Sequence, residues 1–417
     1  MIYCSGNPRK VFSAVCFFVI TWLIIPGACS SLPAAEDAGM KLASEFEGGK
    51  LYQAGKIPVV VMKGNFYQMG RQYGFLLKKE LNEFYEMAVT KYLLGEKKLS
   101  YEKVLTELRE AFDQQPFYVK EWVRGMGETS GLGLDKQIIQ SYVLVPVIMG
   151  GLGCSGLFTW GEYTVDGSSV VARNWDMSAP VLEPYQKFLT VAVFNPVGFG
   201  QGVADINYAG QITWQSAMNQ SGLFYDLQNG SMSDPYETKN RLNSNSALMT
   251  MMLNSTSLEQ ADAFFNSTRS DGGLIINVAD AKQGYSYEWG TFDYRRRVDN
   301  PKGLMADTNN YVDPGWPVTR ELPDGQPSAF TKERRANLLA LGEKNKGKID
   351  AGKMMEIFDI RIPNGGPTFP AGLDIKTYYS IVAVPKELKF WLQVAGLQKW
   401  IEIDLKPLFE SPVEAQP

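Results

Sequence analysis

The chain is organised around the stretch GGLGCSG at positions 150–156, which is followed by a strand-like run that ends in RNWD at positions 173–176. We predict that Cys154 is a catalytic nucleophile. We also predict that it becomes the first residue of a new chain when the peptide bond after Gly153 is cut. Both predictions depend on what the 417-residue sequence contains and on what it lacks.

The sequence contains no histidine. This excludes every Ser-His-Asp or Cys-His arrangement and every metal site that uses histidine, so a nucleophile must pass its proton to another group. A free α-amino group has a pKa of about 7.7–8.0 and can act as a base at neutral pH. A cysteine at a newly exposed N-terminus carries this base on its own backbone. Glycine before it permits the unusual backbone conformation that self-cleavage needs.

Cys154 and the glycines also have simpler interpretations, namely a buried inert thiol and a flexible turn. The RNWD run favours the catalytic interpretation. The guanidinium of Arg173 near the thiol would lower the thiol pKa, and the carboxylate of Asp176 could orient the α-amine. The alternative for Arg173 and Asp176 is a surface ion pair worth about 0–1 kcal/mol.

Residues 1–31 are typical of a signal peptide. Arg9 and Lys10 precede an apolar run over residues 11–25, and small residues follow at 26–31. The run is short for a membrane span, so we expect export to a secreted, periplasmic or lysosome-like location, with an uncleaved anchor as the alternative. Cys29 leaves a membrane lipoprotein open, although Pro26 stands where an aliphatic residue is usual.

Charge and cysteine content narrow the function further. The net charge is −4 and the basic run at 295–297 is short, so nucleic acid is not an expected partner. Apart from Cys154, the cysteines lie in or beside the leader at Cys4, Cys16 and Cys29. Unless Cys29 stays as a lipid anchor, the exported protein keeps one thiol, which cannot form an internal disulfide and is a candidate reactive group. No metal or organic cofactor is implied.

Residues 32–153 are predicted to be mainly helical, after a linker at 34–49 and a strand at 57–62. Helices are expected from the apolar spacing at 76–84, 104–112, 117–126 and 138–143, with Asp135 as a candidate cap of the last one. We interpret this region as a separate α-chain or propeptide that stays packed against the rest after cleavage.

Residues 154–417 are predicted to form a catalytic part that is rich in strands, with turns at Asp166-Gly167 and at 219–222. Strands are expected at 157–163, 169–172, 188–194, 212–218, 223–227, 274–280, 284–289, 378–384 and 390–394. Helices are expected at 246–253, 257–265, 331–342 and 350–358. Two sets of antiparallel strands with helices suit an α+β fold of the four-layer αββα type.

Two blocks of sequence resemble a known family. GCS at 153–155 with DGSSVVARNWD at 166–176 resembles the start of the mature chain in N-terminal nucleophile hydrolases, and GNFYQMGRQYG at 64–74 resembles the opening of the peptidase C45 family. That family includes acyl-CoA:6-aminopenicillanic acid acyltransferase. Choloylglycine hydrolases, penicillin V acylase and acid ceramidase are more distant relatives. The resemblance implies the same αββα sandwich and cleavage before Cys154.

The resemblance also implies site residues far from Cys154 in the sequence. Asn309, in DTNN at 307–310, matches the T-N element of these families, and Asn229 resembles an oxyanion-hole Asn. A side-chain amide there would stabilise the oxygen that becomes negative during acyl transfer. Each Asn could instead end a strand or build a turn, and the sequence NGS at 229–231 also fits a glycosylation acceptor.

The helix at 331–339 resembles the segment that carries a late Arg in these families. Arg335 aligns best, and Lys332 occupies the other basic position. An exposed charged helix face is the alternative. One departure is Asn310, which stands where many C45 relatives have His, so no role of that His carries over.

Together, the residues and the resemblance predict a hydrolase that cleaves linear amide C–N bonds in small N-acyl amides. Cys154 would attack the carbonyl, form an acyl-thioester and release the acid to water. Three alternatives stay open: an acyltransferase in which an amine replaces water, a catalytically inactive exported binding protein, and a secreted peptidase. The sequence does not indicate the acyl group, the amine or the oligomeric state.

Overall fold

The computed structural model describes residues 39–143, 152–177, 180–234, 243–316, 328–370, 373 and 375–409. All of them belong to one structural unit, Ala35–Pro417. The predicted signal peptide, including Cys29, and the glycines at 150–151 lie outside the described residues.

A six-stranded antiparallel sheet carries the predicted nucleophile. Its order is β13-β4-β5-β14-β15-β16. The strands are β4 (Leu152–Thr159), β5 (Val170–Met177), β13 (Leu304–Asp307), β14 (Lys376–Val384), β15 (Lys389–Val394) and β16 (Gln398–Asp404). The turn predicted at Asp166-Gly167 joins β4 to β5, so that Thr159 pairs with Val170. Gly167 has a φ of +79°, a conformation that glycine adopts without strain.

A ten-stranded sheet has the order β1-β2-β3-β6-β7-β8-β9-β10-β11-β12. Its strands are β1 (Lys41–Phe46), β2 (Gly49–Ala54), β3 (Ile57–Gly64), β6 (Leu189–Pro196), β7 (Val203–Tyr208), β8 (Ser216–Asn219), β9 (Phe224–Asn229), β10 (Leu274–Ala279), β11 (Gly284–Trp289) and β12 (Tyr294–Arg297). β3 and β6 pair in parallel, whereas the other ladders of this sheet are antiparallel. The parallel ladder therefore joins the part before Cys154 to the part after it.

The two sheets pack face to face. On β4, Phe158 packs toward Phe224 of the ten-stranded sheet, with ring centroids 6.2 Å apart, whereas Leu157 belongs to a second core on the opposite face. Side chains alternate between the two faces of a strand. Cys154 has the same parity as Phe158 and lies in the core between the sheets.

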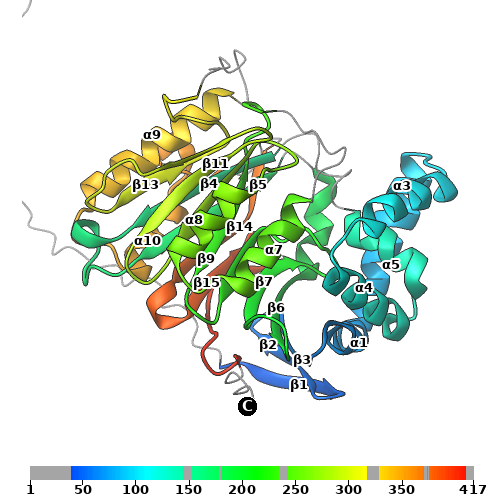
Figure 1. The fold of residues 1–417 in the computed structure, drawn as a ribbon. Helices are drawn as coiled ribbons and strands as arrows, with labels where there is room; N and C mark the ends of the chain where they lie inside the picture. Colours follow the sequence, from blue (N-terminus) through cyan, green and yellow to red (C-terminus); the bar gives the residue numbers. More distant parts are fainter. Residues whose placement is uncertain are drawn as a thin grey trace, which may run out of the picture. The chain divides into compact units, whose positions relative to one another are not determined.

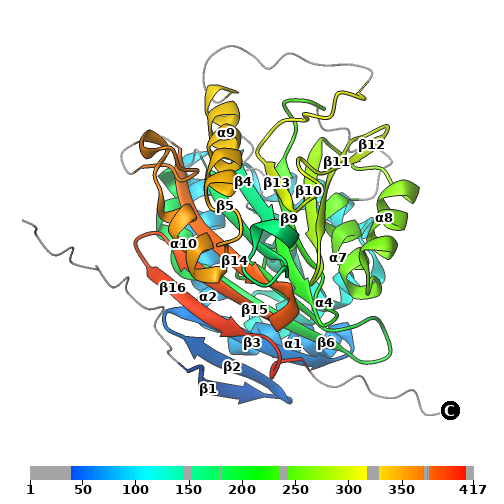
Figure 2. The ribbon, with the colours of Figure 1, turned by 90° about the vertical axis from the view of Figure 1, so that its left-hand side faces the viewer.

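Helices cover the outer face of each sheet (Figure 1; Figure 2). The six-stranded sheet is covered by α9 (Ser328–Lys344) and α10 (Ala351–Asp359), and the ten-stranded sheet by α7 (Ser244–Asn254) and α8 (Leu258–Ser267). Leu338 and Phe358 fill the outer core of the first sheet, and Phe265 stacks on Tyr287 of the second at 4.1 Å. The predicted α+β four-layer αββα sandwich is confirmed.

The N-terminal part adds helices beside β3 (Figure 1). They are α1 (Phe66–Leu76), α2 (Lys78–Phe84), the π-helix η1 (Tyr85–Glu96), α3 (Tyr101–Asp113), α4 (Phe117–Ser130) and α5 (Gly133–Tyr142). Short 3-10 turns occur at η2 (Gly161–Tyr163), η3 (Pro180–Phe188), η4 (Ile362–Asn364) and η5 (Pro385–Glu387). A side chain on Gly70 would lie 2.1 Å from the carbonyl of Trp122, so this glycine of the 64–74 block permits close packing of α1 on α4. No described helix is both long and apolar enough to cross a membrane.

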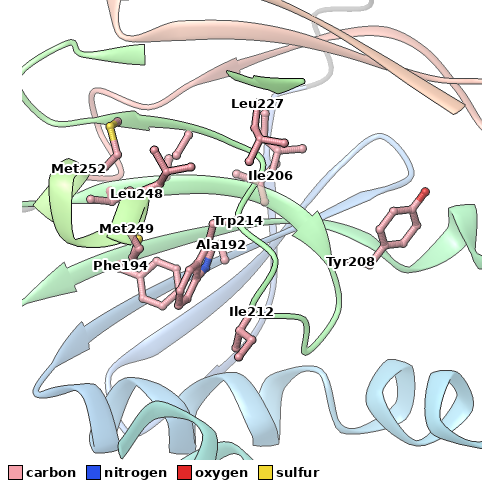
Figure 3. Close-up of a cluster of buried hydrophobic side chains, with 14 of the residues drawn as sticks. Ala192, Phe194, Ile206, Tyr208, Ile212, Trp214, Leu227, Leu248, Met249 and Met252 are labelled. Atoms are coloured by element: carbon pink, nitrogen blue, oxygen red, sulfur yellow. The ribbon is translucent and has the colours of Figure 1, made fainter. Parts of the chain in front are cut away.

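One hydrophobic core joins the parts on either side of Cys154. Trp122 of α4 contacts Phe194 of β6 and Trp214, with centroids 5.3 and 6.1 Å apart. Figure 3 shows the surrounding cluster of Ala192, Phe194, Ile206, Tyr208, Ile212, Trp214, Leu227, Leu248, Met249 and Met252. The helices before the nucleophile are thus packed on strands that follow it.

Four sequence predictions of local structure are wrong. The strand predicted at 157–163 is β4, which ends at Thr159 and is followed by the 3-10 turn η2. The helix α5 begins at Gly133 with Leu132 at its cap position, two residues before the predicted cap Asp135. The segment 34–49, predicted as a linker, contributes β1 and the start of β2. The strand predicted at 212–218 is reduced to β8, which begins at Ser216. The strands β7, β12, β13 and β16 are absent from the sequence prediction. Most side chains of β1 are exposed, so this edge strand shows no apolar alternation that a sequence pattern could detect.

Candidate active site

The backbone nitrogen, the carbonyl oxygen and the sulfur of Cys154 each contact a polar side chain. The residue lies on β4 opposite Trp175 of β5 and is 2% exposed. Its backbone nitrogen donates to Oδ1 of Asn309 at 2.8 Å, and its carbonyl oxygen accepts from Nη1 of Arg334 at 2.9 Å. Its Sγ lies 3.4 Å from Nη2 of Arg173. The predicted nucleophile therefore sits at the meeting point of two arginines and one amide.

Arg173 is held between the sheets with its guanidinium on the thiol. Nη1 donates to the carbonyl of Gln215 at 2.8 Å and to Oγ of Ser216 at 2.5 Å, and Nη2 donates to the carbonyl of Leu227 at 2.7 Å. Burial raises the pKa of the Cys154 thiol, and the nearby Arg173 opposes that rise. A thiol with a raised pKa is mostly protonated at neutral pH, so it needs a base before it can attack.

Asp176 reaches Cys154 through Arg334. Its Oδ2 pairs with Nη1 of Arg334 at 2.7 Å, and its Oδ1 accepts from the hydroxyl of Thr377 at 2.5 Å. Both partners of the ion pair are almost fully buried. Burial raises the pKa of Asp176 to about 6, against the opposing charge of Arg334. The sequence assigns Asp176 to the α-amine directly, whereas the structure places Arg334 between them.

Asn309 is the partner of the Cys154 nitrogen. Its Oδ1 accepts from Cys154 and, at 2.9 Å, from Nη2 of Arg334. Its Nδ2 donates to the carbonyl of Asn229 at 3.0 Å. Two donors on one side and a carbonyl on the other fix the orientation of the amide. Nδ2 carries a second hydrogen, which could donate to an oxyanion, the role that the sequence predicts for Asn309.

Asn229 contributes its backbone to the site. It ends β9, and its carbonyl accepts from Asn309. Its side-chain Oδ1 accepts from the amide of Ser231 at 2.8 Å, which is the turn-forming role that the sequence leaves open as an alternative. The structure therefore brings Asn229 next to Asn309, with its own side chain engaged in the turn.

On α9 the structure brings Arg334 to Cys154, and not Arg335. Arg335 donates to the carbonyl of Ala306 at 3.1 Å and pairs with Asp299. Successive helical residues point about 100° apart, so two neighbouring arginines cannot reach the same site. Arg334 shares a helical face with the buried Leu338, four residues later, and this spacing could have identified it from the sequence. Lys332 is exposed.

The glycines around Cys154 are needed for space. Gly153 is absent from the glycines with positive φ, in contrast to the conformational reason that the sequence suggests. A side chain there would place its Cβ 3.2 Å from Cβ of Asp176. A side chain on Gly156 would meet the amide of Gln228 at 2.8 Å. Both positions therefore let strands and side chains approach the nucleophile closely.

A pocket of about 470 Å³ lies on the side of the six-stranded sheet that carries Asp176. Its wall includes Thr377, Asp359 and Arg361. Asp359 accepts from the indole of Trp400 at 3.1 Å, and Arg361 donates to the carbonyl of Phe369 at 2.8 Å. Within the described ranges, no three His, Cys, Asp or Glu residues are grouped so that they could hold a metal ion.

Comparisons with known proteins give likenesses among solved structures. No family model and no curated protein matches the sequence. A mutant of conjugated bile acid hydrolase from Clostridium perfringens is similar with a TM-score of 0.45 and 13% identity, over 61% of this chain and 93% of that one. The N-acylethanolamine-hydrolyzing acid amidase ortholog of Caenorhabditis elegans gives 0.40 and 15%, over 56% and 93%. Penicillin V acylase from Agrobacterium tumefaciens gives 0.40 and 13%, over 60% and 86%. With TM-scores below 0.5, these likenesses carry no argument for a shared activity.

Proposed function

We propose that this chain is a self-activating cysteine hydrolase that cleaves linear amide C–N bonds in small N-acyl substrates. The observation that carries the proposal is the set of contacts on Cys154: Asn309 on its nitrogen, Arg334 on its carbonyl and Arg173 on its sulfur. A structural cysteine in a core needs none of these partners. A nucleophile whose own nitrogen is the base needs both its nitrogen and its sulfur held in place.

Activation is proposed to be a cut between Gly153 and Cys154. The thiol of Cys154 attacks the carbonyl carbon of Gly153, and the C–N bond breaks as the nitrogen takes up the thiol proton. The acyl group is then a thioester on sulfur, and water cleaves it to a carboxylate on Gly153 and a free thiol. The products are two chains, the second of which begins with the α-amine of Cys154.

In the proposed cycle the new α-amine accepts the thiol proton, and the thiolate attacks the substrate carbonyl. The C–N bond breaks as the α-ammonium gives its proton to the leaving amine. Water, deprotonated by the same α-amine, then hydrolyses the thioester to the acid and restores the thiol. Burial raises the pKa of the Cys154 thiol, so the thiol needs a nearby base, which the α-amine of the same residue provides.

The remaining residues are assigned by their contacts. Arg173 stabilises the thiolate, since it lies 3.4 Å from the sulfur. Asn309 holds the α-amine through Oδ1. Arg334 orients both Asn309 and the Cys154 carbonyl, and Asp176 neutralises and positions Arg334.

The two chains are proposed to remain associated after the cut. β3 and β6 form a parallel ladder from Val59–Val191 to Gly64–Pro196, and Tyr118 of α4 donates to the carbonyl of Ser246 at 2.8 Å. These contacts cross the cut site in sequence and do not depend on the bond at 153–154. Export, with removal of residues 1–31 or lipid attachment at Cys29, is part of the proposal and rests on the sequence of the leader alone.

The deciding experiment combines N-terminal sequencing with intact-mass measurement of the purified protein. We expect a fragment that begins at Cys154 and co-purifies with the upstream fragment. Cys154→Ala should yield one uncut, inactive chain, whereas Cys154→Ser should still be cut, but slowly. Ser155→Ala is the matched control, because Ser155 is buried beside the nucleophile and its Oγ has no hydrogen-bond partner in the described structure.

Activity is measured on a panel of N-acyl amides by the amine that is released. Cut protein whose amine release disappears in Cys154→Ala but not in Ser155→Ala supports the proposal. An intact 153–154 bond in active protein overturns it. Addition of a primary amine separates hydrolysis from acyl transfer, because an acyltransferase would form the new amide in place of the free acid.

A further inference from the structure

Asn309 lies in the connection that follows β13, where Oγ1 of the preceding Thr308 donates to the carbonyl of Thr331 at 3.0 Å. β13 ends at Asp307, and the backbone nitrogen of Asn309 donates to Oγ1 of Thr331 at 2.9 Å. The side-chain Oδ1 of Asn309 accepts a hydrogen bond from the nitrogen of Cys154. The geometry at that nitrogen therefore depends on what holds the residues on either side of Asn309.

Glu288 of β11 holds the residues that follow Asn309. Its side chain is fully buried. Oε1 accepts from the amide of Val312 at 2.6 Å and from the amide of Asp313 at 3.2 Å, and Oε2 accepts from the indole of Trp316 at 2.5 Å. A carboxylate offers about four acceptor positions, and these donors together with Arg297 occupy them.

Arg297 of β12 holds the residues that precede Asn309. Its side chain is 8% exposed. Nε pairs with Oε1 of Glu288 at 3.0 Å. Nη2 forms an ion pair with Asp307 and donates to the carbonyl of Ala306 at 3.4 Å. Asp307, the partner of Arg297, lies opposite Gly156 of β4. Gly156 is two residues after Cys154 on that strand, so the contact of Arg297 with Asp307 lies close to the nucleophile.

We propose that Glu288 and Arg297 form a positioning pair that holds residues 306–313 from both sides and so places the Asn309 amide on the nitrogen of Cys154. The inference rests on the proposed function, in which Asn309 holds the α-amine. Neither residue touches Cys154, so both are positioning residues. The pair also gives a structural role to Arg297, the last residue of the basic run at 295–297.

The arrangement of the pair favours positioning over simple stabilisation. A buried ion pair often adds little to stability compared with apolar residues of similar size. Here Glu288 accepts from the backbone amides of Val312 and Asp313, and Arg297 donates to the carbonyl of Ala306, so the pair contacts the backbone on both sides of Asn309. Arg297 also pairs with the side chains of Asp299 and Asp307. Misplacement of a reacting group by about 1 Å can cost about 10²-fold in rate. Precise placement of the Asn309 amide is therefore a sufficient reason for a buried ion pair at this position.

The test compares Glu288→Gln with Arg296→Gln. The first keeps the shape of the side chain but turns one acceptor into a donor, which must then face the amide or the indole proton that Glu288 now accepts. The control changes the arginine next to Arg297 on the same strand, where it pairs with Asp262 at 3.3 Å and is 47% exposed. Both variants are checked for folding by thermal unfolding and for the cut by intact mass.

We expect folded Glu288→Gln to lose about 10- to 100-fold in kcat, with KM changed less than about threefold, because the acceptor of the α-amine is misplaced while the substrate site is untouched. The acid limb of its pH–rate profile should move, since that limb reports the α-amine. A loss of folded protein alone would lower the amplitude and leave the pH profile unmoved. Unchanged kcat in folded Glu288→Gln, or an equal loss in Arg296→Gln, would overturn the inference.

A second measurement separates this inference from the proposed function. In uncut Cys154→Ala, hydrogen exchange of peptides covering 306–313 should become faster when Glu288→Gln is added and should stay the same when Arg296→Gln is added. If the wild type proves to be uncut, the proposed function fails while this measurement still tests the pair. If exchange is unchanged by Glu288→Gln, the pair does not hold the segment, whatever the activity.

Discussion

Arg334 and Arg335 are neighbours on α9, and replacing each by Gln tests the site most directly. The sequence resemblance assigns the late arginine to Arg335, whereas the structure places Arg334 on Cys154, Asp176 and Asn309. The two variants make the same chemical change one residue apart. We expect Arg334→Gln to be destabilised and inactive and Arg335→Gln to be close to the wild type.

The expected stability loss follows from burial. Arg334 and Asp176 are 2% and 0% exposed as side chains, so removal of Arg334 leaves a buried carboxylate that keeps its hydrogen bond from Thr377 but loses its countercharge. Breaking a buried pair in this way costs about 3–5 kcal/mol. The pair of Arg335 with Asp299 is partly exposed, at 21% and 19%, and pairs near the surface are worth about 0–1 kcal/mol.

The loss should also depend on pH. Burial already raises the pKa of Asp176 to about 6 in the presence of Arg334, and without that charge it must rise further. A carboxyl group whose folded pKa exceeds its unfolded value near 3.9 destabilises the fold above the folded pKa and no longer does so below the unfolded one. The deficit of Arg334→Gln relative to the wild type should therefore shrink as the pH falls from about 8 to about 5.

The measurements are urea unfolding at several pH values, intact mass, and kcat/KM for the released amine. Arg334→Gln should lose about 10²-fold or more in kcat/KM, since both Asn309 and the Cys154 carbonyl lose a charged donor. Adding Asp176→Asn should restore stability but not activity. Arg334→Gln within about 1 kcal/mol and threefold of the wild type, or a greater loss in Arg335→Gln, would refute the reasoning.

Two further predictions concern the thiol and the cut. Arg173→Lys should raise the pKa of the Cys154 thiol, because the ammonium cannot match the forked contacts of the guanidinium. Alkylation of the thiol by iodoacetamide should therefore slow about threefold or more at pH 7 and reach the wild-type rate at high pH. Identical pH–rate profiles of alkylation in the two proteins would contradict this prediction. Gly153→Ala should slow the cut about tenfold, because the new Cβ would lie 3.2 Å from Cβ of Asp176. The control Gly352→Ala, where the nearest contact of the new Cβ is 3.4 Å, should leave the cut unchanged and stabilise α10 by about 0.5–1 kcal/mol. Equal rates of cutting in Gly153→Ala and the wild type, measured by intact mass, would contradict the prediction.

The part of the site that is close in sequence could be predicted because local rules determine it. β4 and β5 are consecutive antiparallel strands, and the connection between them, residues 160–169, includes the predicted Asp166-Gly167 turn. Once the register is set, Cys154 and Arg173 must lie on the same face, since both have the parity of inward-facing residues on antiparallel neighbours. Asp176 has the opposite parity, which is why it meets Arg334 of α9 and not the thiol.

The distant part of the site could not be derived from local patterns. Asn309 follows a strand of four residues, β13, whose pairing with β4 is a tertiary contact. Asn309 is identified from the sequence only through a resemblance, which does not show that its amide lies between the nitrogen of Cys154 and the carbonyl of Asn229. The resemblance alone does not separate Arg334 from Arg335, whereas the helical face that Arg334 shares with Leu338 does.

The place of the proposed cut in the sheets explains how one bond can break without loss of the fold. β4 pairs with β5 over eight residues, from Leu152 to Thr159, and only the pairs of Leu152 and Gly153 lie before the cut. The pairing of β4 with β13 begins at Gly156 and lies entirely after it. Cys154 would therefore keep its strand, both neighbouring strands and the contacts of its sulfur and carbonyl. The cut changes two groups: the carbonyl of Gly153 becomes a carboxylate, and the nitrogen of Cys154 turns from an amide that donates to Asn309 into an amine that can also accept a proton.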